Sequence, residues 1–146
     1  MQRGFTLIEI VVVIGILAVL LSLGLFMSME TLRGTIYRSE AATIVSLLQK
    51  ARSRGMANIE QSPWSVCYVN TQYVVAKGAL CNAATAHDVV AANPGVAAAS
   101  SFADPAKFPT IVFAQLSGNT TATSITVLQD SRTQTIAITH EGTIIW

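Results

Sequence analysis

The feature that most constrains this chain is an apolar run near its N-terminus. The 25 residues from Phe5 to Met29 contain one charged side chain, Glu9. About 20 residues of helix span the ~30 Å hydrocarbon core of a bilayer. A chain in lipid must be helical, because each backbone N–H and C=O needs a partner within the segment. The rest of the sequence contains no second run of this kind. We therefore predict one membrane-spanning helix and one folded head.

The composition is typical of a membrane-attached protein rather than of a soluble domain. Of the 146 residues, 51% are hydrophobic and 12% are charged, whereas about a quarter of the residues in a soluble domain are charged. The net charge of +1 gives no electrostatic reason to expect a nucleic-acid-binding protein.

Hydropathy alone leaves two other interpretations of the apolar run open. One is a cleaved secretory signal peptide, for which Ser22-Leu23-Gly24 offers a small-x-small cleavage pattern. The other is an ordinary signal anchor. Both leave Glu9 unexplained, because an acid near the start of a membrane span costs a few kcal/mol unless it is paired. The charged region before the run is also short for a signal peptide, since it consists of Arg3 alone.

The residues around Glu9 favour a third interpretation. The segment Arg3-Gly4-Phe5-Thr6-Leu7-Ile8-Glu9, followed by an unbroken apolar stretch, resembles the type III signal sequence of type IV prepilins and pseudopilins. The resemblance implies that a prepilin peptidase cuts after Gly4 on the cytoplasmic side. It also implies that the new N-terminal residue, Phe5, is N-methylated, and that Glu9 serves filament assembly.

Elementary electrostatics is compatible with that role for Glu9. Cleavage would turn the Phe5 amide nitrogen into an amine with a pKa near 8. Two opposite charges about 4 Å apart gain roughly 4 kcal/mol at an effective dielectric constant of 20, which is comparable with the cost of keeping a carboxylate in the membrane. Phe5 and Glu9 are one helical turn apart, so a pair within one chain is possible. The resemblance implies instead a pair with the Phe5 amine of a neighbouring subunit. The remaining alternative is that Glu9 only caps its own helix.

The helical pattern continues beyond the apolar run. Residues 30–54 lack proline, and small or apolar side chains recur there at spacings of three and four, which predicts a buried helix face. We expect a helix from Phe5 to Arg54 with Gly55 as its C-cap. The predicted organisation is a leader at 1–4, a membrane or filament-core helix at 5–29, an amphipathic continuation at 30–55 and a β-rich head at 56–146. The side chains of the predicted buried face are Tyr37, Ala41, Ile44, Leu48 and Ala51.

After Pro63 the pattern becomes strand-like, and residues 82–106 look like a long irregular loop with at most a short helical turn. Five or six short antiparallel strands packed on one long helix give an α+β fold. The predicted strands are Trp64–Val69, Gln72–Ala76, Ile111–Gln115, Ser124–Gln129, Thr133–Thr139 and Thr143–Trp146, with turns at Asn70-Thr71, Asp130-Ser131 and Glu141-Gly142.

Three segments of the second half resemble the GspH/FimT branch of the same family. They are Ala51-Arg52-Ser53-Arg54, Phe113 with Ser117-Gly118-Asn119, and Gln134-Thr135-Ile136-Ala137-Ile138 with Gly142-Thr143-Ile144. The branch implies a low-copy minor subunit near the tip of a type IV pilus or a type II secretion pseudopilus. Its expected partners are the prepilin peptidase, other pilin or pseudopilin subunits and the inner-membrane assembly platform. The expected location is the bacterial inner membrane, with an extracytoplasmic head, and then the filament.

The charge distribution bears on a competing function, a head that captures DNA or a surface ligand. Residues 30–54 carry five basic and two acidic side chains, whereas residues 55–146 carry three basic and five acidic ones. The head therefore has no basic cluster to follow a phosphate backbone, and nucleic-acid binding is not favoured. An unprocessed membrane-anchored domain is a third alternative.

The remaining reactive side chains do not predict an enzyme. Cys67 and Cys81 flank the first predicted hairpin. In an oxidising compartment they would form a disulfide worth about 3 kcal/mol in the loop-entropy model, and in a reducing one they would be two free thiols. A zinc site needs four ligands, and His87 and His140 lack metal-like spacing to the cysteines. We expect no catalytic residue, no cofactor and no metal.

Overall fold

The computed structural model describes residues 6–81, 83–100 and 108–146, and it leaves the side chains of residues 24–33 and of residue 83 undescribed. The chain divides into two compact units, Met1–Ile36 and Tyr37–Trp146. Helix α1 (Leu7–Met56) begins in the first unit and ends in the second. The predicted fold class, a long N-terminal helix with an antiparallel β-rich head, is confirmed. The sheet is divided in two, however, and the described strands number eight rather than five or six.

The part of α1 in the second unit contributes one face to the core of the head. The five side chains of the predicted buried face are all less than 9% exposed, which confirms that face. The predicted end of the helix, Arg54, was wrong by two residues. Gly55 is not the C-cap: the helix continues to Met56, and the first left-handed residue is Asn58, with a φ of 52°. The short 3-10 turn η1 (Ile59–Gln61) follows.

The first sheet has the strand order β3-β2-β1-β5, with all neighbours antiparallel. Its predicted hairpin is confirmed, because Val69 pairs with Gln72 across the two-residue turn Asn70-Thr71. Both turn residues have positive φ, as the commonest two-residue hairpin turn requires. The strands are β1 (Trp64–Val69), β2 (Gln72–Lys77), β3 (Ala86–Ala91) and β5 (Ile111–Phe113).

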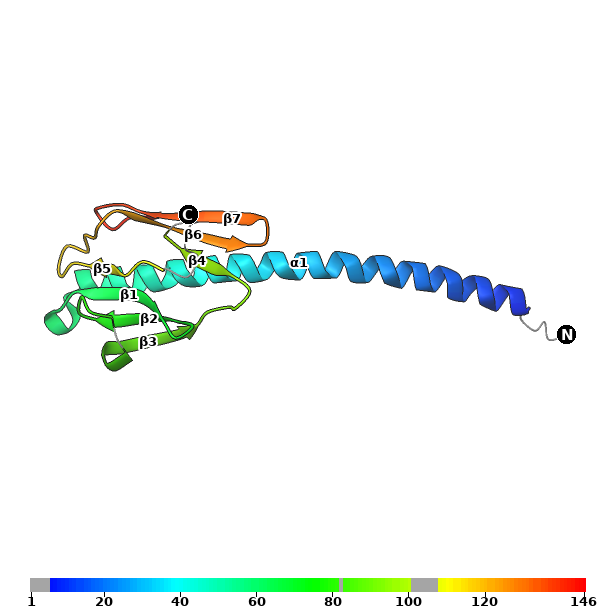
Figure 1. The fold of residues 1–146 in the computed structure, drawn as a ribbon, viewed down its shortest axis with the longest axis horizontal. Helices are drawn as coiled ribbons and strands as arrows, with labels where there is room; N and C mark the ends of the chain where they lie inside the picture. Colours follow the sequence, from blue (N-terminus) through cyan, green and yellow to red (C-terminus); the bar gives the residue numbers. More distant parts are fainter. Residues whose placement is uncertain (1–5, 82, 101–107) are drawn as a thin grey trace. The chain divides into compact units, whose positions relative to one another are not determined.

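The second sheet has the strand order β4-β6-β7-β8, again antiparallel. Gln129 pairs with Arg132 across the predicted turn Asp130-Ser131. Figure 1 shows β6 and β7 along one side of the C-terminal part of α1 and β1 to β3 along another. The strands are β4 (Ala97–Ala99), β6 (Thr123–Gln129), β7 (Arg132–Ile138) and β8 (Ile144–Ile145).

The prediction of a long loop at residues 82–106 was wrong over much of its length. It contains the 3-10 turn η2 (Ala83–Thr85), the edge strand β3 and the short strand β4, whereas residues 101–107 lie outside the described residues. Alanine-rich segments have low intrinsic strand propensity. These segments become strands because β2 and β6 offer them backbone hydrogen-bonding edges.

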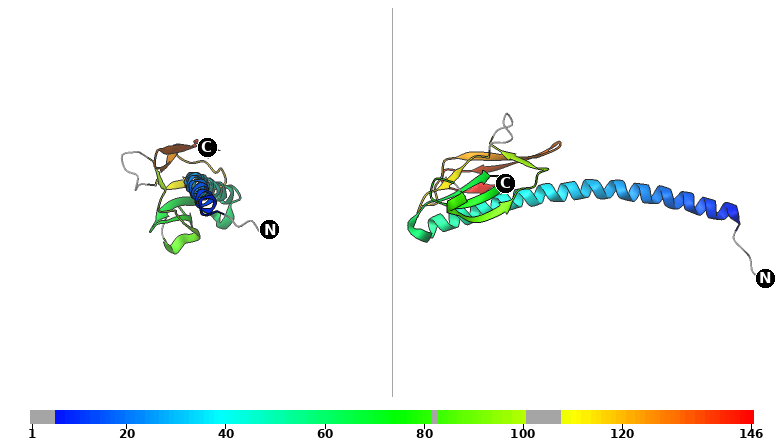
Figure 2. Two further views of the ribbon diagram at one scale, coloured as in Figure 1. Left: turned by 90° about the vertical axis from the view of Figure 1, so that its right-hand side faces the viewer. Right: turned by 60° about the horizontal axis from the view of Figure 1, so that its bottom comes forward.

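One apolar core joins the helix face to both sheets. Trp64 and Phe113 from the first sheet and Ile125 and Ile136 from the second are fully buried in it, together with Leu48 from α1. Figure 2 shows both sheets gathered around this part of α1. Tyr37 to Trp146 therefore form a head with its own core, and the ion-paired residues around Trp64 that are described below lie at its surface.

Candidate functional site

In the first unit, the carboxylate of Glu9 lies within the apolar part of α1. Glu9 is in the first turn of α1, and its backbone N–H donates to the Thr6 carbonyl oxygen at 3.1 Å. Its side chain lines a shallow groove with Ile10, Val13 and Ile14. Gly4 and Phe5, the predicted processing residues, lie outside the described residues. The pairing of Glu9 with a Phe5 amine therefore stays a prediction.

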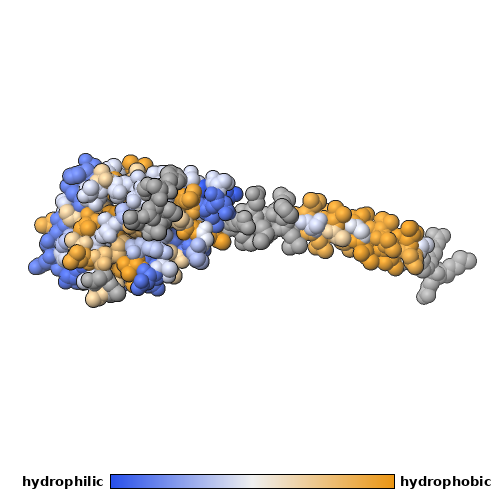
Figure 3. Space-filling view, in the orientation of Figure 1, coloured by the Kyte–Doolittle hydropathy of each residue, from blue (hydrophilic) through white to orange (hydrophobic). Residues whose placement is uncertain are grey.

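The same unit exposes apolar side chains in every direction. From Leu7 to Leu23, each large apolar side chain is between 51% and 81% exposed. Figure 3 shows them as a nearly continuous orange surface, in contrast to the mixed surface of the head. Apolar surface of this extent marks a site for lipid or for other protein chains.

Among the residues that the structure describes, no helix combines the length and the hydropathy needed to cross a membrane.

The second unit places a network of ion pairs around Trp64. The guanidinium of Arg54 lies over the Trp64 ring, 4.6 Å from its centre, and pairs with Asp88 at 2.7 Å. Lys50, one turn earlier on α1, pairs with the other oxygen of Asp88 at 2.8 Å. The network thereby joins the end of α1 to β1 and β3.

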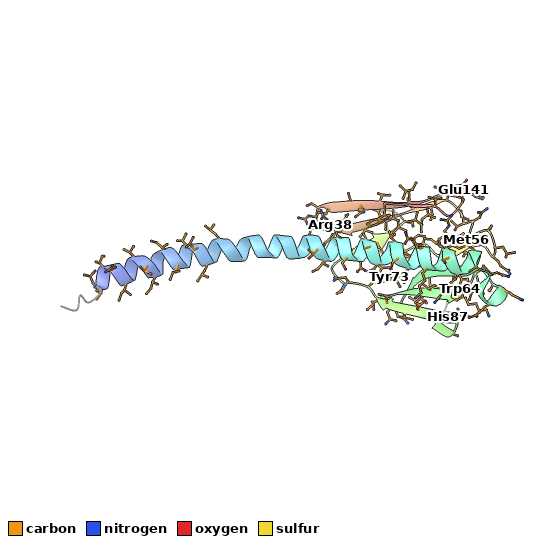
Figure 4. The ribbon with its side chains drawn as sticks, turned by 180° about the vertical axis from the view of Figure 1, so that it is seen from behind. Arg38, Met56, Trp64, Tyr73, His87 and Glu141 are labelled. Carbon is orange, nitrogen blue, oxygen red and sulfur yellow. A yellow bond between two sulfur atoms is a disulfide. The ribbon has the colours of Figure 1, made fainter. Side chains whose placement is uncertain are left out.

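A second set of contacts extends the network across the sheet. Glu60 of η1 pairs with Lys77 of β2 at 2.8 Å, and its other carboxylate oxygen lies 3.3 Å from Nε2 of His87 on β3. The His87 ring meets the Trp64 ring edge-on, with centroids 4.8 Å apart, and both are labelled in Figure 4. His87 and Asp88, which we expected in a loop, are therefore strand residues. Asp88 contacts two cations, whereas His87 contacts a carboxylate.

The carboxylates of this network are held in their charged form. The hydrogen bond from Lys50, opposed by some desolvation and helped by the charge of Arg54, lowers the pKa of Asp88 below its ordinary value. The hydrogen bond from Lys77 does the same to the pKa of Glu60. Lys50, Arg54 and Lys77 are all paired, although two of them share Asp88, so the network has a net charge of +1 and each of its three cations already has a carboxylate partner.

At the end of α1, Arg52 holds two loops together. Its Nη2 donates to the Glu141 carbonyl oxygen at 3.0 Å. Gly118 and Gly142, both with positive φ, lie against it: an added Cβ would be 3.2 Å from Arg52 Cγ at the first and 3.1 Å from Arg52 Nε at the second. Figure 4 shows Met56 and Glu141 at this end of the head. Arg52, Gly118 and Gly142, one residue from each of the three segments that carried the GspH/FimT resemblance, therefore meet in space.

Sequence reasoning missed one buried acid, Glu40 of α1, which is 7% exposed. Its Oε1 accepts the backbone N–H of Asn93 at 3.1 Å. Burial, with the charge and hydrogen bond of Glu40, raises the pKa of Tyr73 above its ordinary value. Glu40 is not one of the positions of the predicted buried face. The sequence signal for its burial was that it directly precedes Ala41, which belongs to that face.

The two cysteines are joined by a disulfide between Cys67 of β1 and Cys81, with their Cα atoms 6.2 Å apart. Within residues 6–81, 83–100 and 108–146, no three His, Cys, Asp or Glu side chains are grouped so that they could hold a metal ion.

Two family models match the sequence. One, described as prokaryotic N-terminal methylation motif, matches residues 1–25, and the other, described as type II transport protein GspH, matches residues 40–142. The second match covers more than half of the chain, including the end of α1, strands β1 to β7, and Arg52 with Gly118 and Gly142. Comparisons with curated proteins and with solved structures found no match.

Proposed function

The chain belongs to the GspH family of type II transport proteins, and on that premise we propose that it is a minor pseudopilin whose assembly depends on Glu9. In this proposal, a prepilin peptidase cuts between Gly4 and Phe5 and the Phe5 amine is methylated. The mature chain then inserts its N-terminal helix into a type II secretion pseudopilus or a type IV pilus.

The observation that carries the proposal is the isolated charge of Glu9 on the exposed apolar surface of α1. A carboxylate in such surroundings needs a cation to offset its desolvation. An amine at Phe5 exists only after cleavage, so the pairing would couple processing to assembly. The match of the N-terminal methylation model to residues 1–25 supports this order of events.

Before assembly, we propose that residues 5–29 span the bacterial inner membrane once, with residues 56–146 outside the cytoplasm. Residues 30–55 continue the helix into the head, and residues 1–4 are the leader. The partners are the prepilin peptidase, neighbouring pilin or pseudopilin subunits and the inner-membrane assembly platform.

A head that captures DNA has less support. Lys50, Arg54 and Lys77, which belong to one surface network, are each paired with a carboxylate. Paired cations release fewer counterions on binding phosphates, and that release supplies most of the non-specific affinity for nucleic acid.

The processing step is tested by the intact mass of the full chain, extracted from membranes after co-expression with a prepilin peptidase. We expect a chain that begins at Phe5 and carries one added methyl group. The matched variant Gly4→Asp should keep Met1 and the leader at the same expression level. An uncut wild-type chain, or a cut after Gly24 as for a signal peptide, would overturn the proposal.

A further inference from the structure

Two arginines of the head differ from the cations of the Trp64 network, because they have no ion-pair partner within the part of the chain that the structure describes. Arg38 is the second residue of the head and lies on α1, and Arg132 is the first residue of β7. Both residues are exposed. Among the described residues, no carboxylate pairs with either of them. Their charges are therefore available to a partner outside the chain.

The tertiary structure brings the two arginines to the same end of the head. The Tyr37 hydroxyl donates to the Val127 carbonyl oxygen at 3.4 Å, which holds the first turn of the head's helix against β6. Burial raises the pKa of Tyr37, and the charge of Arg132 partly opposes that rise, so the guanidinium lies near this hydroxyl. Figure 4 shows Arg38 at the opposite end of the head from Met56. Both arginines therefore lie at the end of the head where α1 enters it.

The length of the chain keeps this end of the head close to the bilayer that residues 5–29 are proposed to span. Arg38 follows Met29 by nine residues of α1, which is about 14 Å of helix. The polar headgroup layer adds about 5–7 Å to each side of the hydrocarbon core. Electrostatic attraction reaches about 8 Å farther at physiological ionic strength. The arginines are therefore within electrostatic reach of the lipid headgroups.

We propose that this end of the head docks on the anionic headgroups of the membrane that holds α1, through Arg38 and Arg132. The inference rests on the proposed membrane span. Guanidinium groups bind phosphate oxygens through charge-assisted, bidentate hydrogen bonds, and each basic residue near an anionic surface favours contact by about fivefold. Asp130, in the turn beside Arg132, is acidic, so the docking face is only weakly positive. Docking of this strength is reversible and leaves the subunit free to enter a filament.

The test uses the full chain in lipid nanodiscs made of phosphatidylcholine alone or of phosphatidylcholine with phosphatidylglycerol. A fluorophore attached to the Ser131→Cys variant reports on the turn between β6 and β7, and nitroxide-labelled headgroups quench it on contact. The native cysteines are bonded to each other and do not react with the label. Phosphatidylglycerol should raise the ratio of quenched to unquenched heads by about five- to thirtyfold, and about 1 M salt should reverse the rise. The same fluorophore on Ser53→Cys, an exposed position near the other end of the head, should show no rise.

Two double variants separate these arginines from the general charge of the head. Arg38→Gln with Arg132→Gln should lose the effect of phosphatidylglycerol at position 131. Lys50→Gln with Lys77→Gln removes the same amount of charge from the Trp64 network and should keep the effect.

Three results would overturn the docking proposal while leaving the membrane span intact: equal quenching in the two lipid mixtures, a lipid effect that survives in the arginine double variant, or an equal rise at Ser53→Cys. A chain that does not enter nanodiscs at all would instead refute the proposed span, and with it the docking that rests on the span.

Discussion

Arg54 lies over the ring of Trp64, with its guanidinium carbon 4.6 Å from the ring centre. Trp64 is 1% exposed and belongs to the main core, whereas Arg54 reaches the surface and pairs with Asp88. The arginine therefore closes the core at the end of α1 and connects that end to an edge strand.

Replacing Arg54 with methionine keeps a long apolar stem over Trp64 but removes the cation and its ion pair. We expect the free energy of unfolding to fall by about 1–3 kcal/mol. Denaturant titration followed by near-ultraviolet circular dichroism measures the loss. Arg38→Met is the matched control, because Arg38 is an exposed arginine of the same helix, and it should change stability by less than about 0.5 kcal/mol. Equal losses in both variants would contradict this role for Arg54.

Gly142 is required by space as well as by backbone conformation. Its φ is +74°, and an added Cβ would collide with the Gly118 carbonyl oxygen and press on Arg52. Gly142→Ala should therefore lower the free energy of unfolding by about 2–4 kcal/mol and loosen the contacts of Arg52 with Gly118 and Glu141. Gly78→Ala is the control, since its φ is +91° but no atom lies within 4 Å of the added Cβ. It should cost only the backbone strain, about 1–2 kcal/mol. The two thermal midpoints give the comparison, and a Gly78 variant as unstable as the Gly142 variant would refute the steric argument.

The free energy of unfolding of the head should depend on pH through the protonation of Asp88. The hydrogen bond from Lys50, with the charge of Arg54, lowers the pKa of Asp88 in the folded state. A carboxyl with a lowered folded-state pKa stabilises the fold above its unfolded-state pKa, and that contribution is lost as the pH falls through the folded-state value. Asp88→Asn should be less stable than wild type at pH 7, and the gap should close below about pH 4. Glu60 and Glu141 also have lowered pKa values, so the informative quantity is the difference between the two proteins. A gap that persists at pH 2 would mean that Asp88 does not act through its charge.

Glu9→Gln separates processing from assembly. The variant keeps the size of Glu9 and one acceptor oxygen, but it replaces the other oxygen with a donating NH2 group and cannot pair as an anion with an amine. We expect normal cleavage after Gly4, measured by intact mass, and at least tenfold less incorporation into sheared filaments, measured by immunoblot. Glu141→Gln is the control, because it removes an exposed carboxylate from the head, and it should assemble as wild type does. Normal assembly of the Glu9 variant would show that assembly does not require the charge of Glu9.

Structural elements that depend on a pattern of neighbouring residues could be predicted from the sequence. The apolar face of the helix from Tyr37 to Ala51 follows from spacing alone, and the hairpin around Asn70-Thr71 follows from two β-rich runs separated by two turn residues. The edge strand β3 could not be predicted in this way. Apolar and polar residues do not alternate in its sequence, although its side chains alternate between half-buried and exposed in the sheet, and its pairing partner, β2, supplies the hydrogen bonds. The split into two sheets was hidden for the same reason: strand order is a property of pairings between distant residues.

The sequence by itself determined the apolar helix with its single acid, the strands of the two hairpins and the residues that face the core, because periodicity and turn chemistry act over a few residues. Only the tertiary structure decided which charges meet. Asp88 and Glu60 are acids of no special spacing until β3 and η1 come to lie beside the end of α1, where they pair with Lys50, Arg54 and Lys77. Likewise, Gly118 and Gly142 are ordinary turn glycines in the sequence, and they become sterically required when two loops close on Arg52. Charge pairing and steric exclusion act over a few ångströms in space, so residues far apart in the chain acquire these roles only in the folded head.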